Sequence, residues 1–125
     1  MAEHQIAEVP ERIWLAGKKV AKTWSAQYNV AGWINVISGQ GSFSLVARYQ
    51  DTEGVKEVVI DSATASSAGA LLLSNKATFQ FSGKAKNMVL LLIASDAAAR
   101  FSVDELYMQD AQAPQSTQSK LVAAY

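Results

Sequence analysis

The stretch NMVLLLIA, residues 87–94, decides the fold, because seven consecutive apolar residues follow Asn87. Turn signals border it on both sides, residues 82–84 (SGK) before it and residues 95–96 (SD) after it. A run this short and this apolar is a buried strand or a piece of buried helix, and the turn signals favour the strand. Successive side chains of a strand point to opposite faces, so both faces of this strand are apolar. The stretch therefore predicts a central strand that is covered on both sides.

Elsewhere, short strand patterns alternate with turn-forming residues. Residues 43–50 (FSLVARYQ) alternate most clearly, which predicts one face on the core and one mostly toward water. In residues 28–38 the same period places Tyr28 and Trp33 on opposite faces. Residues 38–42 (SGQGS) and 51–54 (DTEG) predict tight turns, since glycine accepts positive φ angles and Asp favours the first turn position. The predicted strands are 20–24, 28–38, 43–50, 55–60, 70–73, 77–81, 87–94 and 101–108, with a loop over 61–69 and a turn over 74–76.

The pattern of the last strand, residues 101–108, changes phase along its length. Apolar residues occupy odd positions at its start, Phe101 and Val103, and even positions at its end, Leu106 and Met108. One extra residue in a strand produces such a change. The sequence therefore predicts a β-bulge at residues 104–105.

Breaks every 8–12 residues are typical of a β-sandwich or barrel, and no interval carries an amphipathic helix long enough for a crossover. We therefore expect an all-β fold, an antiparallel β-sandwich of jelly-roll type with extended N- and C-terminal arms. Residues 1–12 form a polar N-terminal arm or edge segment, residues 13–109 the sandwich domain, and residues 110–125 an extended tail.

Composition excludes several classes of function. The 125 residues carry 11 basic and 11 acidic side chains, and this zero net charge argues against nucleic-acid binding driven by bulk electrostatics. It also offers little protection against self-association. The chain has no cysteine, which excludes disulfides and thiolate metal sites. The N-terminus lacks the apolar segment of a secretory signal, and the longest apolar run is too short to span a bilayer, so we expect no membrane partner.

Residues that could carry catalysis are few. The single histidine, His4, lies in the polar arm, where we expect a solvated side chain rather than a catalytic base. Asp51 and Glu53 share one turn and are expected to be solvated there, with a calcium site as the alternative. Asp104 and Glu105 are neighbours on a strand, so they point to opposite faces unless the bulge turns one of them. We therefore expect no enzyme, no catalytic site, no cofactor and no metal.

Aromatic residues are the stronger lead to a binding surface. Trp33 interrupts an apolar strand, which favours a place in the core, whereas Trp14 adjoins the polar arm and is expected at an interface. Exposed aromatic side chains on a β-sandwich anchor a partner protein or stack on sugar rings. The residues expected to make contacts are Trp14, Trp24, Tyr28, Tyr49, Leu121, Val122 and Tyr125.

Residues 39–54 (GQGSFSLVARYQDTEG) resemble a hairpin of small tailed-phage virion proteins, in which a strand–turn–strand unit opens a β-sandwich. Residues 87–94 and 101–108 continue the resemblance, which covers about half of the chain. It implies a non-enzymatic structural role in the virion, such as capsid decoration, by a protein made in the host cytoplasm. The implied partners are further copies of the chain and capsid or other assembly proteins, contacted through self-association and arm exchange.

Residues 101–108 (FSVDELYM) are similar to the closing strand of carbohydrate-binding jelly rolls. That similarity implies that the aspartate, Asp104 here, helps to fix the last strand and is not itself a sugar ligand. The alternative function is therefore a carbohydrate-binding module, with Trp14, Trp24 or Tyr28 as the stacking platform.

Overall fold

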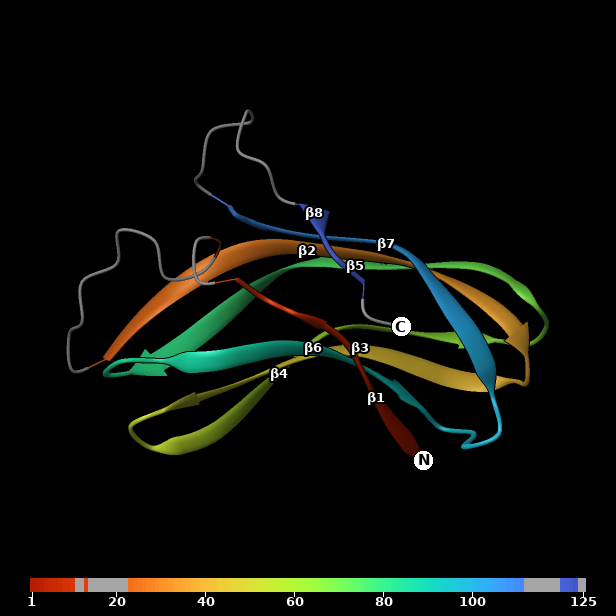
Figure 1. Cartoon of the computed structure of the whole chain (residues 1–125), viewed down its shortest axis with the longest axis horizontal. Coiled ribbons are helices and arrows are strands. Elements are labelled where there is room, and N and C mark those ends of the chain that lie inside the picture. The colour runs from red at the N-terminus through yellow and green to blue at the C-terminus, as the bar shows by residue number, and fades with distance from the viewer. Residues whose placement is uncertain (11–12, 14–22, 112–119, 124–125) are drawn as a thin grey trace.

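The computed structural model describes residues 1–10, 13, 23–111 and 120–123, and these residues form the strands labelled in Figure 1. The strands are β1 (Ala2–Glu8), β2 (Thr23–Ser38), β3 (Gly41–Asp51), β4 (Gly54–Ala65), β5 (Gly69–Ser82), β6 (Lys86–Ala94), β7 (Arg100–Asp110) and β8 (Lys120–Leu121).

The strands are arranged in two antiparallel sheets packed face to face, which confirms the predicted all-β sandwich. One sheet has the order β1-β6-β3-β4 and the other the order β5-β2-β7-β8. They are the lower and upper layers in Figure 1, and we call them the lower and upper sheets. The strands β3 to β6 follow a Greek-key order, since β6 returns to lie beside β3 while β5 continues into the upper sheet.

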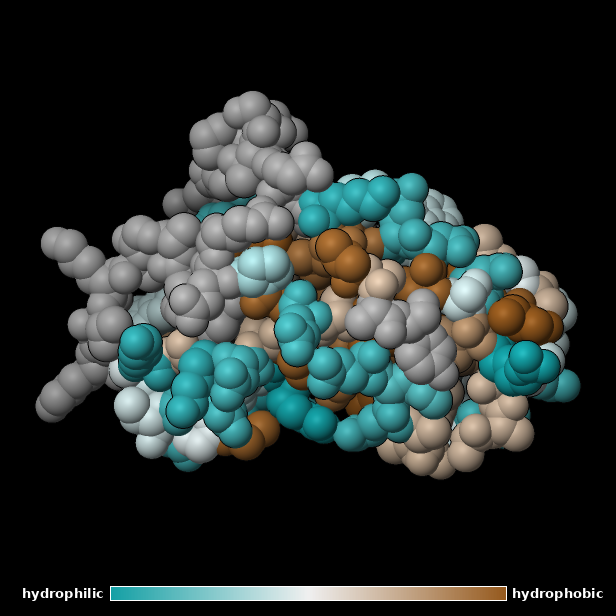
Figure 2. Space-filling view, in the orientation of Figure 1, coloured by the Kyte–Doolittle hydropathy of each residue, from teal (hydrophilic) through white to brown (hydrophobic). Residues whose placement is uncertain are grey.

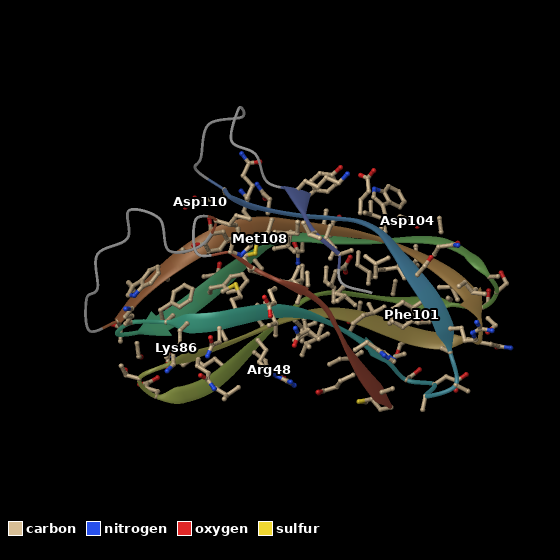
Figure 3. All side chains as sticks on the ribbon, in the orientation of Figure 1. Arg48, Lys86, Phe101, Asp104, Met108 and Asp110 are labelled. Atoms are coloured by element: carbon tan, nitrogen blue, oxygen red, sulfur yellow. The ribbon has the colours of Figure 1, made fainter. Side chains whose placement is uncertain are left out.

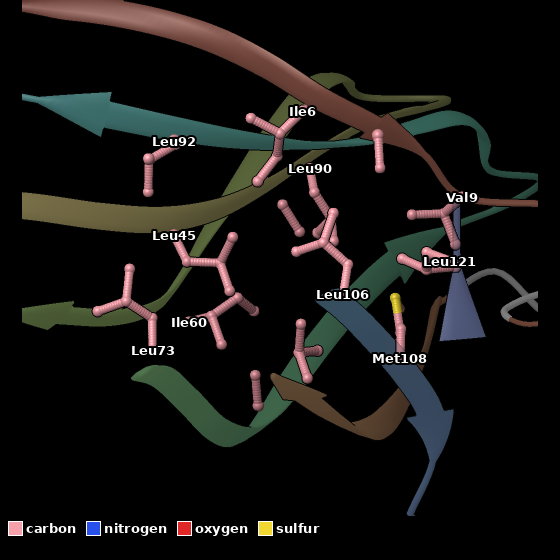
Figure 4. Packing of buried hydrophobic residues seen from close by; sticks show 14 of the residues in the cluster. Ile6, Val9, Leu45, Ile60, Leu73, Leu90, Leu92, Leu106, Met108 and Leu121 are labelled. Atoms are coloured by element: carbon pink, nitrogen blue, oxygen red, sulfur yellow. The ribbon is translucent and has the colours of Figure 1, made fainter. Parts of the chain in front are cut away.

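The predicted central strand is β6, which lies between β1 and β3 in the lower sheet. Leu90 and Leu92 are fully buried between the sheets, where they join the core cluster shown in Figure 4. Leu91 points to the outer face of the lower sheet, yet it is only 3% exposed. Burial of each such side chain stabilises the fold by about 1.5–3 kcal/mol. The inner face of this stretch is therefore buried, and its outer face is buried at Leu91 and half-buried at Val89 and Ile93, which supports the predicted central strand.

The alternation in β2 places Tyr28, Val30, Ile34 and Val36 in the core, and the strand begins five residues earlier than predicted. Gly32 continues this inward-facing series. A Cβ atom at this position would lie 3.0 Å from Cδ2 of Leu106, so the glycine makes room for a side chain of the neighbouring strand β7. The glycine break at 38–42 is also confirmed, because Gly39 and Gly41 have φ angles of 101° and 112°.

The β-bulge predicted in the last strand is confirmed at Asp104. Trp33 pairs with Glu105 and Ile34 pairs with Val103, which leaves Asp104 without a partner position on β2. The bulge restores the inward direction of the side chains that follow, so that the apolar residues at both ends of β7 are buried. Figure 3 shows Phe101 between the two layers and Asp104 on the outer side of the upper sheet.

The predicted loop at 61–69 and the predicted turn at 74–76 are wrong over most of their length. β4 continues to Ala65, because residues 61–65 pair with residues 41–45 of β3 and their small side chains fit a sheet surface. β5 runs unbroken through residues 74–76, because each of its residues pairs with β2. Continuous pairing satisfies the backbone and overrides the turn preference of Ser, Asn and Lys.

Side-chain bonds join the two sheets where β4 meets β5. The Asp61 carboxylate accepts a hydrogen bond from the backbone N–H of Ser74 at 3.0 Å. The Asn75 amide donates one to the carbonyl oxygen of Ile60, also at 3.0 Å. These bonds close one side of the sandwich and explain why Asn75, which resembled a turn residue, lies within a strand.

The N-terminal segment forms an edge strand and not a free arm, in agreement with the edge segment that was one of its two interpretations. β1 pairs with β6, and Ile6 and Ala7 are fully buried. On the outer face, the Arg48 guanidinium contacts the carboxylate of Glu3 on β1 at 2.9 Å and also that of Glu57 on β4. By the strand register, the line from Arg48 to Glu3 crosses β6 at Leu91, which explains why Leu91 is covered.

The C-terminal segment adds the short strand β8 to the edge of β7, with Leu121 opposite Leu106. Leu121 is 4% exposed and belongs to the core cluster, whereas Val122 is 86% exposed. In Figure 4 Leu121 points toward Val9, at the end of the cluster next to Met108. Figure 2 shows apolar residues gathered in the middle of the side on which β1 and β8 lie.

Candidate functional site

The outer face of the upper sheet carries an exposed aromatic platform. Trp33 is 42% exposed, and the strand register places Leu72 of β5 on one side of it and Glu105 of β7 on the other. Leu72 is also 42% exposed. The expectation that Trp33 lies in the core is therefore wrong, because Trp33 has the opposite phase to the buried residues of β2.

Beside Trp33 the same face is hollowed, with a volume of about 500 Å³. Ala31, two residues before Trp33 on β2, brings only a methyl group to this face, so the backbone and the flanking side chains define the depression. The next outward-facing residue of β2 is Asn29. The side chains that surround the hollow are mostly polar, and its outward-facing residues are Asn29, Ala31, Ser74, Lys76, Tyr107 and Gln109.

Tyr107 is held in place by a neighbour on its own strand. Its hydroxyl group donates a hydrogen bond to the carboxylate of Glu105, two residues earlier on the same face of β7. That bond is the main cause that raises the pKa of Tyr107, because the carboxylate stabilises the protonated phenol. Glu105 thus links the phenol of Tyr107 to the row that contains Trp33.

Tyr28 and Tyr49, which were expected to make contacts, are both core residues. Tyr28 packs edge-on against Phe79, with 5.3 Å between ring centroids, and burial raises its pKa. The Tyr49 hydroxyl donates a hydrogen bond of 2.6 Å to the carbonyl oxygen of Gln80. Neither ring offers a surface to a sugar or a partner in this conformation. Both lie in phase with the apolar residues of their strands, which is the physical reason for their burial.

Trp24 is half-buried and packs on its own chain. Its ring stacks on Phe81 with 4.1 Å between the centroids, and its indole N–H donates to the carbonyl oxygen of Gly83 at 3.2 Å. One face of Trp24 is therefore occupied by the sandwich. The other two expected aromatic contacts, Trp14 and Tyr125, lie outside the described residues.

His4 is not the solvated terminal residue that its polar surroundings suggested. It lies half-buried on β1, and its ring meets Phe101 edge-on with 5.0 Å between centroids. The arm containing it pairs with β6, so the histidine is held at the side of the core.

Asp51 and Glu53 make stabilising contacts at the turn between β3 and β4. Lys56 contacts both carboxylates, at 2.7 Å from Asp51 and 2.9 Å from Glu53. Asp51 also accepts hydrogen bonds from the backbone N–H groups of Ser82 and Glu53. Burial alone would raise the pKa of Asp51, but these bonds together lower it. Asp51 therefore joins the turn to the end of β5 and is fully covered rather than solvated.

Sequence reasoning missed the two aromatic residues that flank the hollow. Trp33 carried a usable signal, since the period of β2 already placed it opposite Tyr28. Tyr107 could be placed only after the bulge at Asp104 was located, because the bulge decides which face each later residue of β7 takes.

Within the part of the chain that the structure describes, no group of three or more His, Cys, Asp or Glu side chains is arranged to hold a metal ion. No helix among those residues is long and apolar enough to cross a membrane. No family model matches the chain, and searches among curated proteins and solved structures find no significant similarity.

Proposed function

We propose that the chain is a non-enzymatic structural module of a larger assembly, specifically a tailed-phage virion, in which it decorates or stabilises the capsid. It acts by self-association, with terminal strands exchanged between copies. Its partners are further copies of itself and capsid or other assembly proteins. The resemblance of residues 39–54 to a virion hairpin motivates the choice of assembly.

The observation that carries the proposal is the way Leu121 is held. It is buried in the core although β8 contains only two residues, which pair with Leu106 and Tyr107. The tail of another copy can make the same pairing and bury the same side chain. Exchange of identical elements between protomers is a low-cost route to oligomers, because the contacts between protomers are the same as those within one chain.

A second surface supports docking on a different partner. Val55 and Val59 of β4 project from the outer face of the lower sheet, where they pair with Gln50 and Val46 of β3. These two side chains are 60% and 61% exposed, and the ion pair of Arg48 with Glu57 lies beside them. An apolar centre with a charged rim is the usual anatomy of a protein–protein interface.

Light scattering after size-exclusion chromatography tests self-association. The full chain is measured at several concentrations and compared with a chain that lacks residues 111–125 and with the Leu121→Asp variant. We expect concentration-dependent oligomers from the full chain and monomers from both variants, with circular dichroism confirming that the variants remain β-sheet proteins. A full chain that stays monomeric at every concentration, indifferent to loss of the tail, contradicts the proposal.

Carbohydrate binding is the second candidate function, and the hollow beside Trp33 is the observation that favours it. Of the residues first expected to act as platforms, Tyr28 is buried, Trp24 is stacked on Phe81, and Trp14 lies outside the described residues. Trp33 takes their place. A glycan array, probed with the full chain and with Trp33→Ala, tests this function. If the full chain bound no glycan on the array, carbohydrate binding would be ruled out.

A further inference from the structure

We infer that the hollow on the outer face of β5, β2 and β7 binds an acidic oligosaccharide, whose chain lies along β2 from Trp33 to Asn29. The assignment rests on the second candidate function and is independent of self-association.

Trp33 and Leu72 provide the apolar part of the site. They pair across β2 and β5, and both are exposed on the same face. The C–H groups on one face of a pyranose ring are weakly positive, and they pack favourably on the negative face of an indole ring. A flat aromatic surface beside a hollow, with few other apolar groups around it, suits a sugar ring better than a purely apolar ligand.

The polar side chains lie on the other side of Ala31. Asn29 presents an amide group, which contains both donors and an acceptor. Tyr107 adds a phenol whose orientation is fixed by Glu105. Sugar hydroxyl groups are also both donors and acceptors, so this set matches the hydrogen-bonding chemistry of a saccharide.

Charge decides the class of saccharide. Lys76 pairs with Asn29 and is the charged side chain among the described residues that line the hollow. Glu105 lies in the row of Trp33, at the opposite end. A sugar carboxylate is therefore attracted to the Lys76 end and repelled from the Trp33 end. This asymmetry favours an acidic unit at Lys76 and a stacked ring on Trp33.

The length of the site requires more than one sugar unit. Asn29 and Trp33 are four residues apart on β2, which corresponds to about 13 Å along an extended strand. A single ring cannot reach both Trp33 and Lys76, whereas a short oligosaccharide can. The site therefore predicts weak binding of monosaccharides and tighter binding of trisaccharides.

Calorimetric titration with 3′-sialyllactose, a trisaccharide with a single carboxylate on its terminal unit, tests the inference, with its methyl ester as the matched neutral probe. The full chain is compared with Trp33→Ala, Lys76→Gln and the control Val59→Ala, which removes an exposed apolar side chain from the opposite sheet. We expect Trp33→Ala to weaken binding of the acidic probe by about tenfold or more. Lys76→Gln should abolish the preference for the acidic probe over its ester. Val59→Ala should bind like the unchanged chain.

Three outcomes would overturn the inference in different ways. Binding of the acidic probe that Trp33→Ala leaves unchanged places the sugar elsewhere on the molecule. Equal binding of the acid and its ester, unaffected by Lys76→Gln, removes the acidic class while carbohydrate binding stands. Failure of both probes, with silence on a broad glycan array, overturns the inference together with the second candidate function. Light scattering on the same samples reports self-association separately.

Discussion

Leu106 and Leu121 lie opposite each other in the ladder between β7 and β8, and both side chains are buried. The last described strand of the chain is therefore part of the core, although it contains only two residues. The next residue, Val122, is almost fully exposed, and Ala123 is partly buried against the core, so Leu121 is the main apolar anchor of the tail.

The Leu121→Ala variant should lower the free energy of unfolding by about 2 kcal/mol, the lower end of the range for a buried leucine. Val122→Ala, its matched control, should change the free energy by less than about 0.5 kcal/mol, since its side chain is in water. Urea unfolding at fixed protein concentration measures both. Equal effects of the two variants would show that Leu121 is not anchored in the core.

Two glycines with positive φ angles should respond differently to alanine. Gly39 and Gly54 have φ angles of 101° and 120°, but a Cβ atom on Gly39 would lie 2.8 Å from the Cα of Ala99, whereas one on Gly54 meets open space. Gly54→Ala should cost about 1 kcal/mol of backbone strain, and Gly39→Ala should cost more. Thermal unfolding of the two variants side by side checks the order. A smaller loss at Gly39 would contradict the packing of residue 99 against this turn.

Arg48 should contribute to stability mainly by covering Leu91 and holding β1. Arg48→Ala removes the contacts with Glu3 and Glu57 and exposes the apolar surface beneath. Arg48→Met keeps an apolar cover without the charge, so it should recover most of the loss. The exposed ion pairs contribute at most about 1 kcal/mol, and high salt screens that part. If Met were no better than Ala, the covering role would be wrong.

Stability should fall in acid partly because of Asp51. Hydrogen bonds and the Lys56 ammonium lower its pKa in the folded protein, so the folded state prefers the ionised carboxylate more than the unfolded chain does. This contribution is present above about pH 4, the ordinary pKa of aspartate, and is lost as the pH falls through the lowered value. Asp51→Asn should be less stable than the unchanged chain at neutral pH, and the difference should shrink in acid. A pH-independent difference would contradict the assignment.

Sequence patterns predicted the sandwich because the core residues of most strands alternate with outward-facing residues. The periods of β2 and β3 identified their buried faces, the apolar run of β6 indicated a central strand, and the phase change in β7 located the bulge at Asp104. The predictions failed where pairing decides the structure. Residues 61–65 and 74–76 are short of strand-forming side chains, and only the partner strands β3 and β2 make them extended.

The candidate site was harder to predict, because it depends on which residues are neighbours across strands. Leu72 and Lys76 lie beside Trp33 and Asn29 through the pairing of β2 with β5. Tyr107 lies beside Ala31 through the pairing of β2 with β7. Residue type alone instead favoured the aromatic residues Tyr28 and Tyr49, which alternation places in the core.

Cysteine trapping tests the exchange of terminal strands most directly, since the chain has no cysteine of its own. Tyr107 lies between Ala31 on β2 and Lys120 on β8, so a cysteine at 107 can be paired with one on either side. The double variant Tyr107→Cys with Ala31→Cys is the control and should oxidise within one chain.

Exchange of the tail predicts that Tyr107→Cys with Lys120→Cys, oxidised at a concentration where oligomers form, gives covalent dimers and larger species on a non-reducing gel. Covalently closed monomers alone, from a sample that light scattering shows to be oligomeric, would mean that each tail pairs with its own sheet and would contradict exchange.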